Sequence, residues 1–201
     1  MAETVFITGA DKGLGFSLAE KFLHEGFRVF AGQYDAGAVN LQSLVERFPR
    51  MLTLVPLDVT NMDSVRRAAE IVSEQSPALD ALINSAGVFL EDTEVPLEQL
   101  DLTDQHLERE MDVNAFGPLQ VTRQLLSLLR RGARKLIVNI SSEAGGIADC
   151  QRDRWFAYCT SKTALNMQSD ESVEGIFRLA AKDWQADDGI FMGYDGGPRW
   201  W

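Results

Sequence analysis

Two kinds of hydrophobic pattern alternate along this chain, and their alternation limits the folds open to it more than any other feature. Short β-branched and aromatic runs such as TVFIT at 4–8 are typical of buried strands, whereas apolar residues three and four apart between Leu14 and His24 are typical of an amphipathic helix. The predicted strands span 4–8, 28–32, 51–59, 78–87, 135–141 and 189–194. The predicted helices span 14–24, 39–48, 64–75, 104–129, 155–168 and 171–183, with a bend or junction expected at Pro118. This order predicts an α/β protein with a mainly parallel sheet.

Right-handed crossovers would wind such a chain into a Rossmann-like, doubly wound sheet with helices on both faces, a three-layer α/β/α arrangement. The 201 residues are enough for one domain with a substantial core, so we expect a single domain over 1–201. Sheets of this kind bind ligands at the carboxyl ends of their strands, which is where functional motifs are expected.

Charge and cysteine content narrow the function classes. The chain has 19 Lys and Arg against 30 Asp and Glu, a net charge of −11, which argues against a nucleic-acid or anionic-membrane surface. Cys150 and Cys159 make no disulfide framework, and the amino-terminal stretch has neither a basic region nor a long apolar run, so a cytoplasmic location is predicted. His24 and His106 lack the spacing of metal ligands, and no metal site is expected.

The stretch TGADKGLG at 8–15 follows the first predicted strand and opens a helix. Its glycines, Gly9, Gly13 and Gly15, allow positive φ and let the backbone approach a ligand closely. The following helix would present free N–H groups and a positive dipole end to a pyrophosphate. A glycine-rich strand–helix turn is the alternative, but the position after the first strand favours dinucleotide binding.

Two further features bear on the cofactor. Lys12 lies inside the glycine loop, where it could meet a phosphate or simply be solvated. The second strand is followed by Gln33 and Tyr34 where a carboxylate would hold a ribose 2′-hydroxyl, and Asp35 comes one or two places late. The absence of that carboxylate, together with Lys12, favours NADP(H) over NAD(H).

A second constellation lies further along the chain. Tyr158 and Lys162 are four apart on a predicted helix and therefore share a face, although a surface pair would have the same spacing. Ser141 and Ser142 follow a predicted strand at its carboxyl end, and Asn114 lies in a helix upstream. A carbonyl that accepts hydride needs a proton donor, and a neighbouring ammonium would lower the tyrosine pKa from its ordinary value of about 10. A serine hydroxyl could hold the substrate oxygen.

Six motifs in order resemble those of the short-chain dehydrogenase/reductase family over residues 1 to about 168. They are TGADKGLG, LDVT (57–60), NSAG (84–87), DVNAFG (112–117), NISSEAG (139–145) and YCTSK (158–162). The stretch 80–120 is most similar to carbonyl-reductase-like members. The usual N-N-A-G of the family reads N-S-A-G here, so Ser85 departs from the pattern.

The resemblance implies a role for each matched residue. The implied cofactor-binding residues are Gly9, Asp11, Lys12, Gly13, Leu14, Gly15, Asp58, Val59, Asn84, Ala86, Gly87, Tyr158 and Lys162. The implied catalytic residues are Asn114, Ser142, Tyr158 and Lys162. Tyr158 would be the acid/base, Lys162 would bind the nicotinamide ribose, and Asp58 would lie by the adenine. Ser142 would orient the carbonyl and Asn114 would hold a relay water. Ser142 is preferred over Ser141 because the family pattern S-x-x-G fits Ser142 to Gly145.

The resemblance breaks at the join 169–170. Members of the family continue into a sixth strand, a Pro-Gly turn and a substrate loop, whereas DESVEGIFRLAAKD, which starts at Asp170, resembles their carboxyl-terminal end. Three interpretations stay open: the protein has a further segment at this join, the strand 189–194 takes the place of the sixth strand, or the protein binds cofactor without turnover. The expected function is an NAD(P)-dependent oxidoreductase acting on a small-molecule carbonyl or alcohol. The alternative is a non-catalytic NAD(P)-binding regulatory protein, and the resemblance implies a homodimer or homotetramer.

Overall fold

The computed structural model describes residues 2–90, 95–101, 103, 105–148 and 153–167. The chain forms two compact units, one of Met1–Ala86 with Pro118–Ile140, the other of Gly87–Gly117 with the described part of Ser141–Trp201. The predicted helix 171–183, the predicted strand 189–194 and the join at 169–170 lie outside the described residues. The expectation of a single domain stays a prediction.

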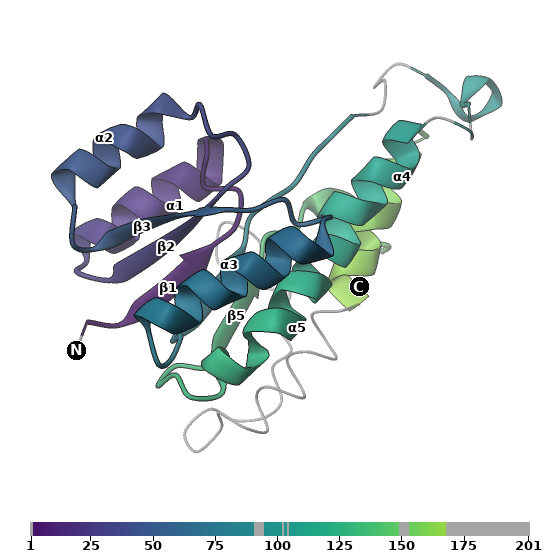
Figure 1. Cartoon of the computed structure of the whole chain (residues 1–201). Helices are drawn as coiled ribbons and strands as arrows, with labels where there is room; N and C mark the ends of the chain where they lie inside the picture. Colours follow the sequence, from purple (N-terminus) through teal and green to yellow (C-terminus); the bar gives the residue numbers. More distant parts are fainter. Residues whose placement is uncertain (1, 91–94, 102, 104, 149–152, 168–201) are drawn as a thin grey trace. The chain divides into compact units, whose positions relative to one another are not determined.

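The first unit contains a parallel five-stranded sheet with the order β3-β2-β1-β4-β5 (Figure 1). The strands are β1 (Thr4–Ile7), β2 (Arg28–Gln33), β3 (Leu52–Pro56), β4 (Ala81–Asn84) and β5 (Leu136–Asn139). The chain runs outward from β1 to β3 and then returns to add β4 and β5 on the other side of β1. The direction of winding therefore reverses between β1 and β4, which confirms the predicted doubly wound sheet.

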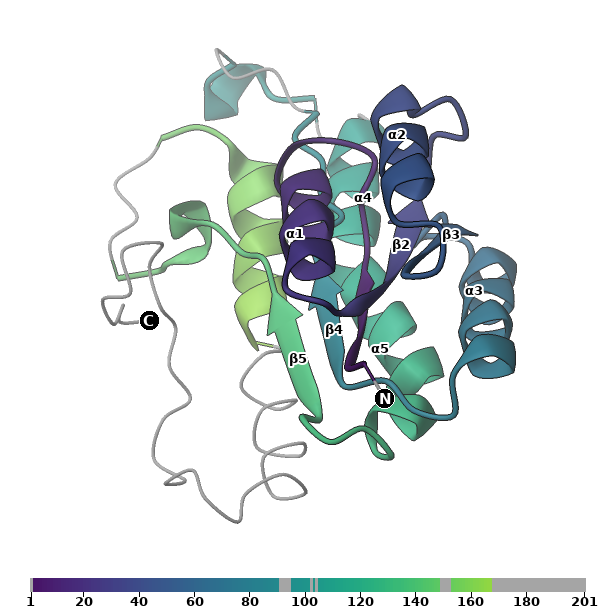
Figure 2. The same cartoon turned by 90° about the vertical axis from the view of Figure 1, so that its left-hand side faces the viewer.

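Helices cover both faces of this sheet. The helices α1 (Gly13–His24) and α2 (Val39–Arg47) lie on one face, and α3 (Met62–Gln75) and α5 (Gly117–Leu129) lie on the other (Figures 1 and 2). The helix α3 begins two residues before its predicted start because Asn61 Oδ1 accepts hydrogen bonds from the N–H groups of Asp63 (2.9 Å) and Ser64 (3.1 Å). Such an N-cap satisfies donors that the helix itself leaves unpaired.

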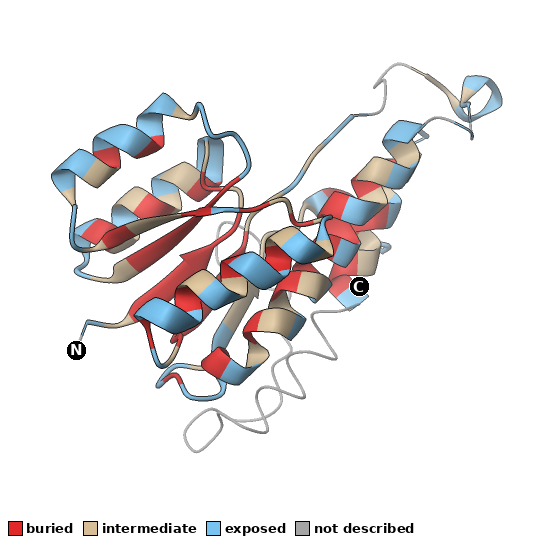
Figure 3. Ribbon diagram, viewed as in Figure 1, coloured by how far each residue is buried: buried red, intermediate tan, exposed pale blue. Residues whose placement is uncertain are grey.

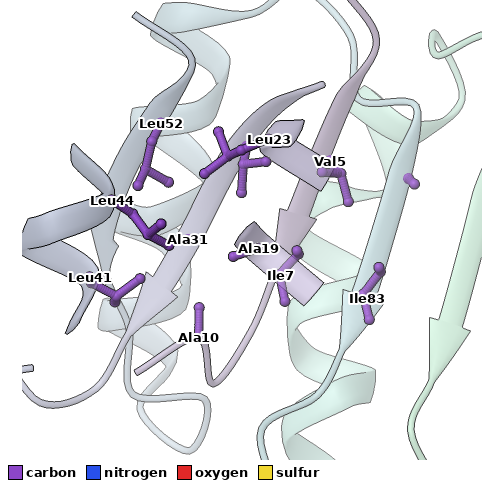
Figure 4. Packing of buried hydrophobic residues seen from close by; sticks show 12 residues of the cluster. Val5, Ile7, Ala10, Ala19, Leu23, Ala31, Leu41, Leu44, Leu52 and Ile83 are labelled. Carbon is purple, nitrogen blue, oxygen red and sulfur yellow. The ribbon is translucent and has the colours of Figure 1, made fainter. Parts of the chain in front are cut away.

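Successive side chains of a strand point to opposite faces of the sheet, so they fill the hydrophobic core on both sides of it. Val5 and Ile7 of β1 belong to the cluster that packs with Ala19 and Leu23 of α1 and with residues of α2 (Figure 4). Phe6 is also fully buried, and it points to the opposite face because successive strand residues alternate. Both faces of the central strands are therefore covered, as their burial shows in Figure 3. Burying each large apolar side chain of this kind contributes about 1.5–3 kcal/mol to the free energy of unfolding.

Two predicted strands are shorter than expected because side chains capture the backbone beyond them. The strand predicted over 51–59 ends at Pro56, since Asp58 Oδ1 accepts bonds from the Thr60 N–H (2.9 Å) and hydroxyl (2.7 Å) and turns the chain toward α3. The strand predicted over 78–87 spans Ala81–Asn84 only. The N–H groups of the next two residues, Ser85 and Ala86, donate hydrogen bonds to the hydroxyl of Thr8, directly after β1, and not to a neighbouring strand.

The described part of the second unit is helical. It contains η1 (Leu97–Gln99), α4 (Gln105–Met111), the π-helical turn η2 (Asp112–Phe116), η3 (Glu143–Gly145) and a helix over 156–167. The irregularity expected at Pro118 is this π turn, which ends just before α5 begins at Gly117. Pro118, which has no N–H to donate, lies where this π turn continues into α5. Within the described ranges, no helix has both the length and the apolar character needed to cross a membrane.

Candidate functional site

The glycine loop of the first unit is folded tightly against its surroundings. Gly9 has φ +63°, and a Cβ built on it would lie 2.7 Å from the Cα of Ala86, in the turn after β4. A Cβ on Gly15 would lie 2.2 Å from the carbonyl oxygen of Gly9. Gly13 has φ +57° but no atom within 4 Å of such a Cβ. Gly9 and Gly15 therefore need to be glycine because the backbone approaches them closely. Gly9 and Gly13 need to be glycine because their φ angles are positive.

The region beyond β2, where the sequence has no carboxylate directly at the strand end, contacts a carboxylate from another segment. Asp11 of the glycine loop reaches it, and its two carboxylate oxygens accept hydrogen bonds from the backbone N–H groups of Tyr34 (3.1 Å) and Asp35 (2.9 Å). Asp11 thus braces the loop against the end of β2. The first turn of α1 contains no acidic residue, and the exposed Lys12 is its N-cap. The positive end of α1 and Lys12 together suit a phosphate.

The other predicted cofactor-binding residues of the first unit lie in different surroundings. The side chain of Asn84 donates a hydrogen bond to Asn139 Oδ1 (2.8 Å) and so joins β4 to β5. Asp58 is part of the turn before α3, Val59 is buried and Leu14 is 54% exposed. Sequence reasoning missed Thr8, whose hydroxyl oxygen accepts bonds from the N–H groups of Ser85 and Ala86, both at 3.0 Å. A threonine directly before the first loop glycine was the available signal.

The second unit brings several predicted site residues together. Tyr158 and Lys162 lie on the helix over 156–167, and Lys162 Nζ lies 5.8 Å from the centre of the Tyr158 ring. Lys162 is only 5% exposed. A Cβ on Gly87 would lie 3.4 Å from Asn114 Oδ1 and 3.6 Å from Lys162 Nζ. Three segments far apart in the sequence therefore converge next to the tyrosine.

The side chain of Asn114 is engaged by the protein. Its Oδ1 accepts a hydrogen bond from the Val88 N–H, and its Nδ2 donates to the Val88 carbonyl, both at 2.8 Å. Nδ2 also donates to the buried hydroxyl of Ser161 (3.1 Å), which in turn donates to the carbonyl of Tyr158 (2.8 Å). Asn114 thereby fastens the segment after β4 to the tyrosine helix. Both N–H groups of Asn114 are used in these bonds, and its expected role in holding a relay water stays a prediction. Ser161 is a second residue that the sequence did not reveal.

The two candidate serines have different partners. The Ser141 hydroxyl donates to Asn166 Oδ1 (2.5 Å), and Asn166 Nδ2 donates to the carbonyl of Gly145 (3.1 Å). The Ser142 oxygen accepts a bond from the Ala144 N–H (3.2 Å), which leaves its O–H able to donate to a substrate. The preference for Ser142 over Ser141 stays a prediction. Asn166, which anchors this segment to the helix over 156–167, was not identified from the sequence.

Among the described residues, no group of three or more His, Cys, Asp and Glu side chains is placed to hold a metal ion. Burial lowers the pKa of Lys162 from 10.5 to about 8. Below about pH 8 the folded protein therefore holds a buried ammonium, which destabilises it relative to the unfolded chain.

We expect the free energy of unfolding to rise between about pH 8 and pH 10.5 because the unfolded chain keeps the lysine proton longer than the folded chain. The rise from this group is on the order of 3 kcal/mol. Lys162→Met should remove it and should be the more stable protein below about pH 8. Urea denaturation across this range, with wild type and variant side by side, measures the difference. Parallel curves for the two proteins would contradict the assignment to Lys162.

Comparison with known proteins places the chain in a family of dehydrogenases. A sequence model of the short chain dehydrogenase family matches residues 3–174. The chain is 34% identical over 176 residues to the mitochondrial D-beta-hydroxybutyrate dehydrogenase of Bos taurus, an alignment that covers 84% of this chain and 48% of that protein. It is 36% identical over 170 residues to the estradiol 17-beta-dehydrogenase 2 of Mus musculus, covering 83% of this chain and 42% of that protein.

Among solved structures, the NADPH-bound carbonyl reductase from chicken fatty liver matches with a TM-score of 0.83 and 27% sequence identity. That alignment covers 100% of this chain and 99% of the reductase chain. The chain spans about half the length of the curated relatives it matches.

Proposed function

The chain belongs to the short chain dehydrogenase family, and we propose that it is an NAD(P)-dependent oxidoreductase. It would transfer a hydride between a nicotinamide cofactor and a ketone, an aldehyde or a secondary alcohol. The observation that carries this proposal is the convergence of Gly87, Asn114 and Lys162 next to Tyr158 within the second unit. The names of the relatives, which include dehydrogenases and a carbonyl reductase, support the same reaction class.

In this proposal the residues of the second unit manage the charge on the substrate oxygen. When bound, the nicotinamide supplies or accepts the hydride. Tyr158 donates a proton to the oxygen as negative charge develops there, and the Lys162 ammonium stabilises the phenolate that results. The Ser142 O–H donates a hydrogen bond to the same oxygen. A positioned acid of this kind contributes about 10²–10⁴-fold to the rate.

For the cofactor we propose NADP(H) over NAD(H). The glycine loop and the start of α1 fit a pyrophosphate, and the N-cap position of the exposed Lys12 suits an additional phosphate. Asp11 places its carboxylate against the backbone beyond β2, so the proposal assigns the additional phosphate to Lys12 and not to the end of that strand. The chicken carbonyl reductase with the same fold was solved with NADPH bound.

We expect Lys12→Gln to raise the KM for NADPH by about 10- to 100-fold, which corresponds to the loss of one hydrogen bond to a charged group. The KM for NADH should change little, because NADH lacks the additional phosphate. Steady-state kinetics with both cofactors measure the ratio. Lys21→Gln is the matched control, since it removes the same charge from the last turn of α1. An equal rise for both cofactors would assign Lys12 to the shared pyrophosphate instead.

The test of the function is consumption of NADPH or NADH by the purified protein with a panel of ketones and aldehydes. Carbonyl-dependent consumption supports the oxidoreductase. Binding of NADPH, detected by its fluorescence, with no consumption by any member of the panel supports the non-catalytic NAD(P)-binding alternative. A cytoplasmic location and a homodimer or homotetramer stay predictions.

A further inference from the structure

The second unit contains an aromatic cluster that the proposed proton transfer does not use. The ring of Phe89 lies 4.7 Å from the ring of Tyr158, centre to centre, at an angle of 41°. Trp155 meets the same phenylalanine edge to face, with a distance of 5.3 Å between ring centres. Phe89 is 41% exposed, so part of its ring is open although it contacts the proposed catalytic tyrosine.

The backbone on both sides of Phe89 is anchored. Val88 exchanges two hydrogen bonds with the side chain of Asn114, and the Leu90 N–H donates to Oε1 of Glu110. Glu110 is fully buried and lies four residues before Asn114, so both anchors come from the same side of the helical stretch. Such anchoring fixes the backbone of Phe89, and the contacts with Tyr158 and Trp155 determine where its ring lies.

Trp155 is held in an unusual conformation. Its φ of +64° is left-handed, a region that bulky residues rarely occupy. Its carbonyl accepts the hydrogen bond from the Cys159 N–H (2.8 Å) at the start of the helix that carries Tyr158. Strained residues persist where the surrounding structure demands them, and they gather at functional sites.

We propose that Phe89 and Trp155 form an aromatic shelf beside Tyr158 that binds a flat apolar group next to the substrate carbonyl. The substrate class is therefore aryl or other planar ketones and aldehydes, and not short oxo acids. Aromatic rings stack on or meet edge-on a planar substituent. A carboxylate placed on these rings would lose hydration without gaining a cation from either ring. This inference rests on the proposed function, because it takes Tyr158 as the group that meets the carbonyl.

The test compares binding of acetophenone with that of cyclohexyl methyl ketone, which has a similar size but no aromatic ring. Ligand-observed NMR in saturating NADP⁺ measures both dissociation constants without turnover. We expect the wild type to prefer acetophenone by about 2- to 10-fold. Phe89→Leu should abolish this preference. Phe116→Leu should keep it, since Phe116 lies in the same unit and is similarly exposed, at 46%. Trp155→Gly, which tolerates the left-handed backbone, should reduce it.

Equal binding of the two ketones by the wild type, or an unchanged preference in both Phe89→Leu and Trp155→Gly, would overturn the shelf. The turnover assay separates this result from a failure of the proposed function. A protein that binds acetophenone selectively but never consumes NADPH keeps the shelf and loses the oxidoreductase. A protein that reduces both ketones and shows no binding preference keeps the oxidoreductase and loses the shelf.

Discussion

Tyr158→Phe should lower kcat for carbonyl reduction by about 10²- to 10⁴-fold and leave NADPH binding intact. The substitution removes only the phenolic hydroxyl, which is the proposed proton donor. The ring that remains keeps its contact with Phe89 at 4.7 Å and its position 5.8 Å from Lys162 Nζ. The measurement is kcat with a carbonyl substrate that the wild type consumes, together with NADPH titration of the variant.

Tyr34→Phe is the control for this prediction. It removes the same hydroxyl from a side chain of the first unit that is 67% exposed, and kcat should not change. If Tyr158→Phe kept the turnover of the wild type, the proton would come from another group, and Ser142 would be the next candidate. If both variants lost turnover equally, the loss would reflect a general effect of removing a tyrosine hydroxyl and not the chemistry of Tyr158.

The sequence predicted best the strands that are buried on both faces of the sheet. In β1 and β2 both faces are covered, so the apolar run is continuous and its limits follow the layers around it. The predicted strands that ran too long fail for a different reason. Asp58 turns its own segment, and Thr8 captures the N–H groups after β4 from more than 70 residues away. Such a contact leaves no local pattern in the segment that it ends.

In the candidate site too, local spacing predicted some contacts, whereas others depend on how the chain folds. Tyr158 and Lys162 are four residues apart on a helix, so their spacing predicted a shared face, and Lys162 Nζ lies 5.8 Å from the centre of the Tyr158 ring. The brace from Asp11 to the end of β2 depends on a loop conformation that the glycine spacing allows but does not specify. Glu110 was not identified from the sequence, yet it is fully buried and accepts a hydrogen bond from the Leu90 N–H. Its role depends on which residues the fold places opposite α4, and periodicity does not encode that.

Gly15→Ala should add a methyl group that the glycine loop cannot accommodate without moving. The new Cβ would lie 2.2 Å from the carbonyl oxygen of Gly9, which is backbone and has no rotamer that could make room. The glycine loop would have to open, and a displacement of about 1 Å at a binding site can reduce function about 10²-fold. We therefore expect NADPH affinity to fall by about that factor, and the free energy of unfolding to fall by about 1–3 kcal/mol. Fluorescence titration with NADPH and urea denaturation measure the two quantities.

Gly13→Ala separates the effect of space from that of backbone conformation. Gly13 has φ +57°, but a Cβ there would meet no atom within 4 Å, so the substitution carries only the penalty of a left-handed alanine, about 1–2 kcal/mol. Its loss of stability should thus be comparable to that of Gly15→Ala, whereas its loss of NADPH affinity should be much smaller. Equal losses of affinity would mean that the loop needs flexible glycines and not the close approach of Gly15 to Gly9. An undiminished affinity in both variants would remove the glycine loop from the cofactor site.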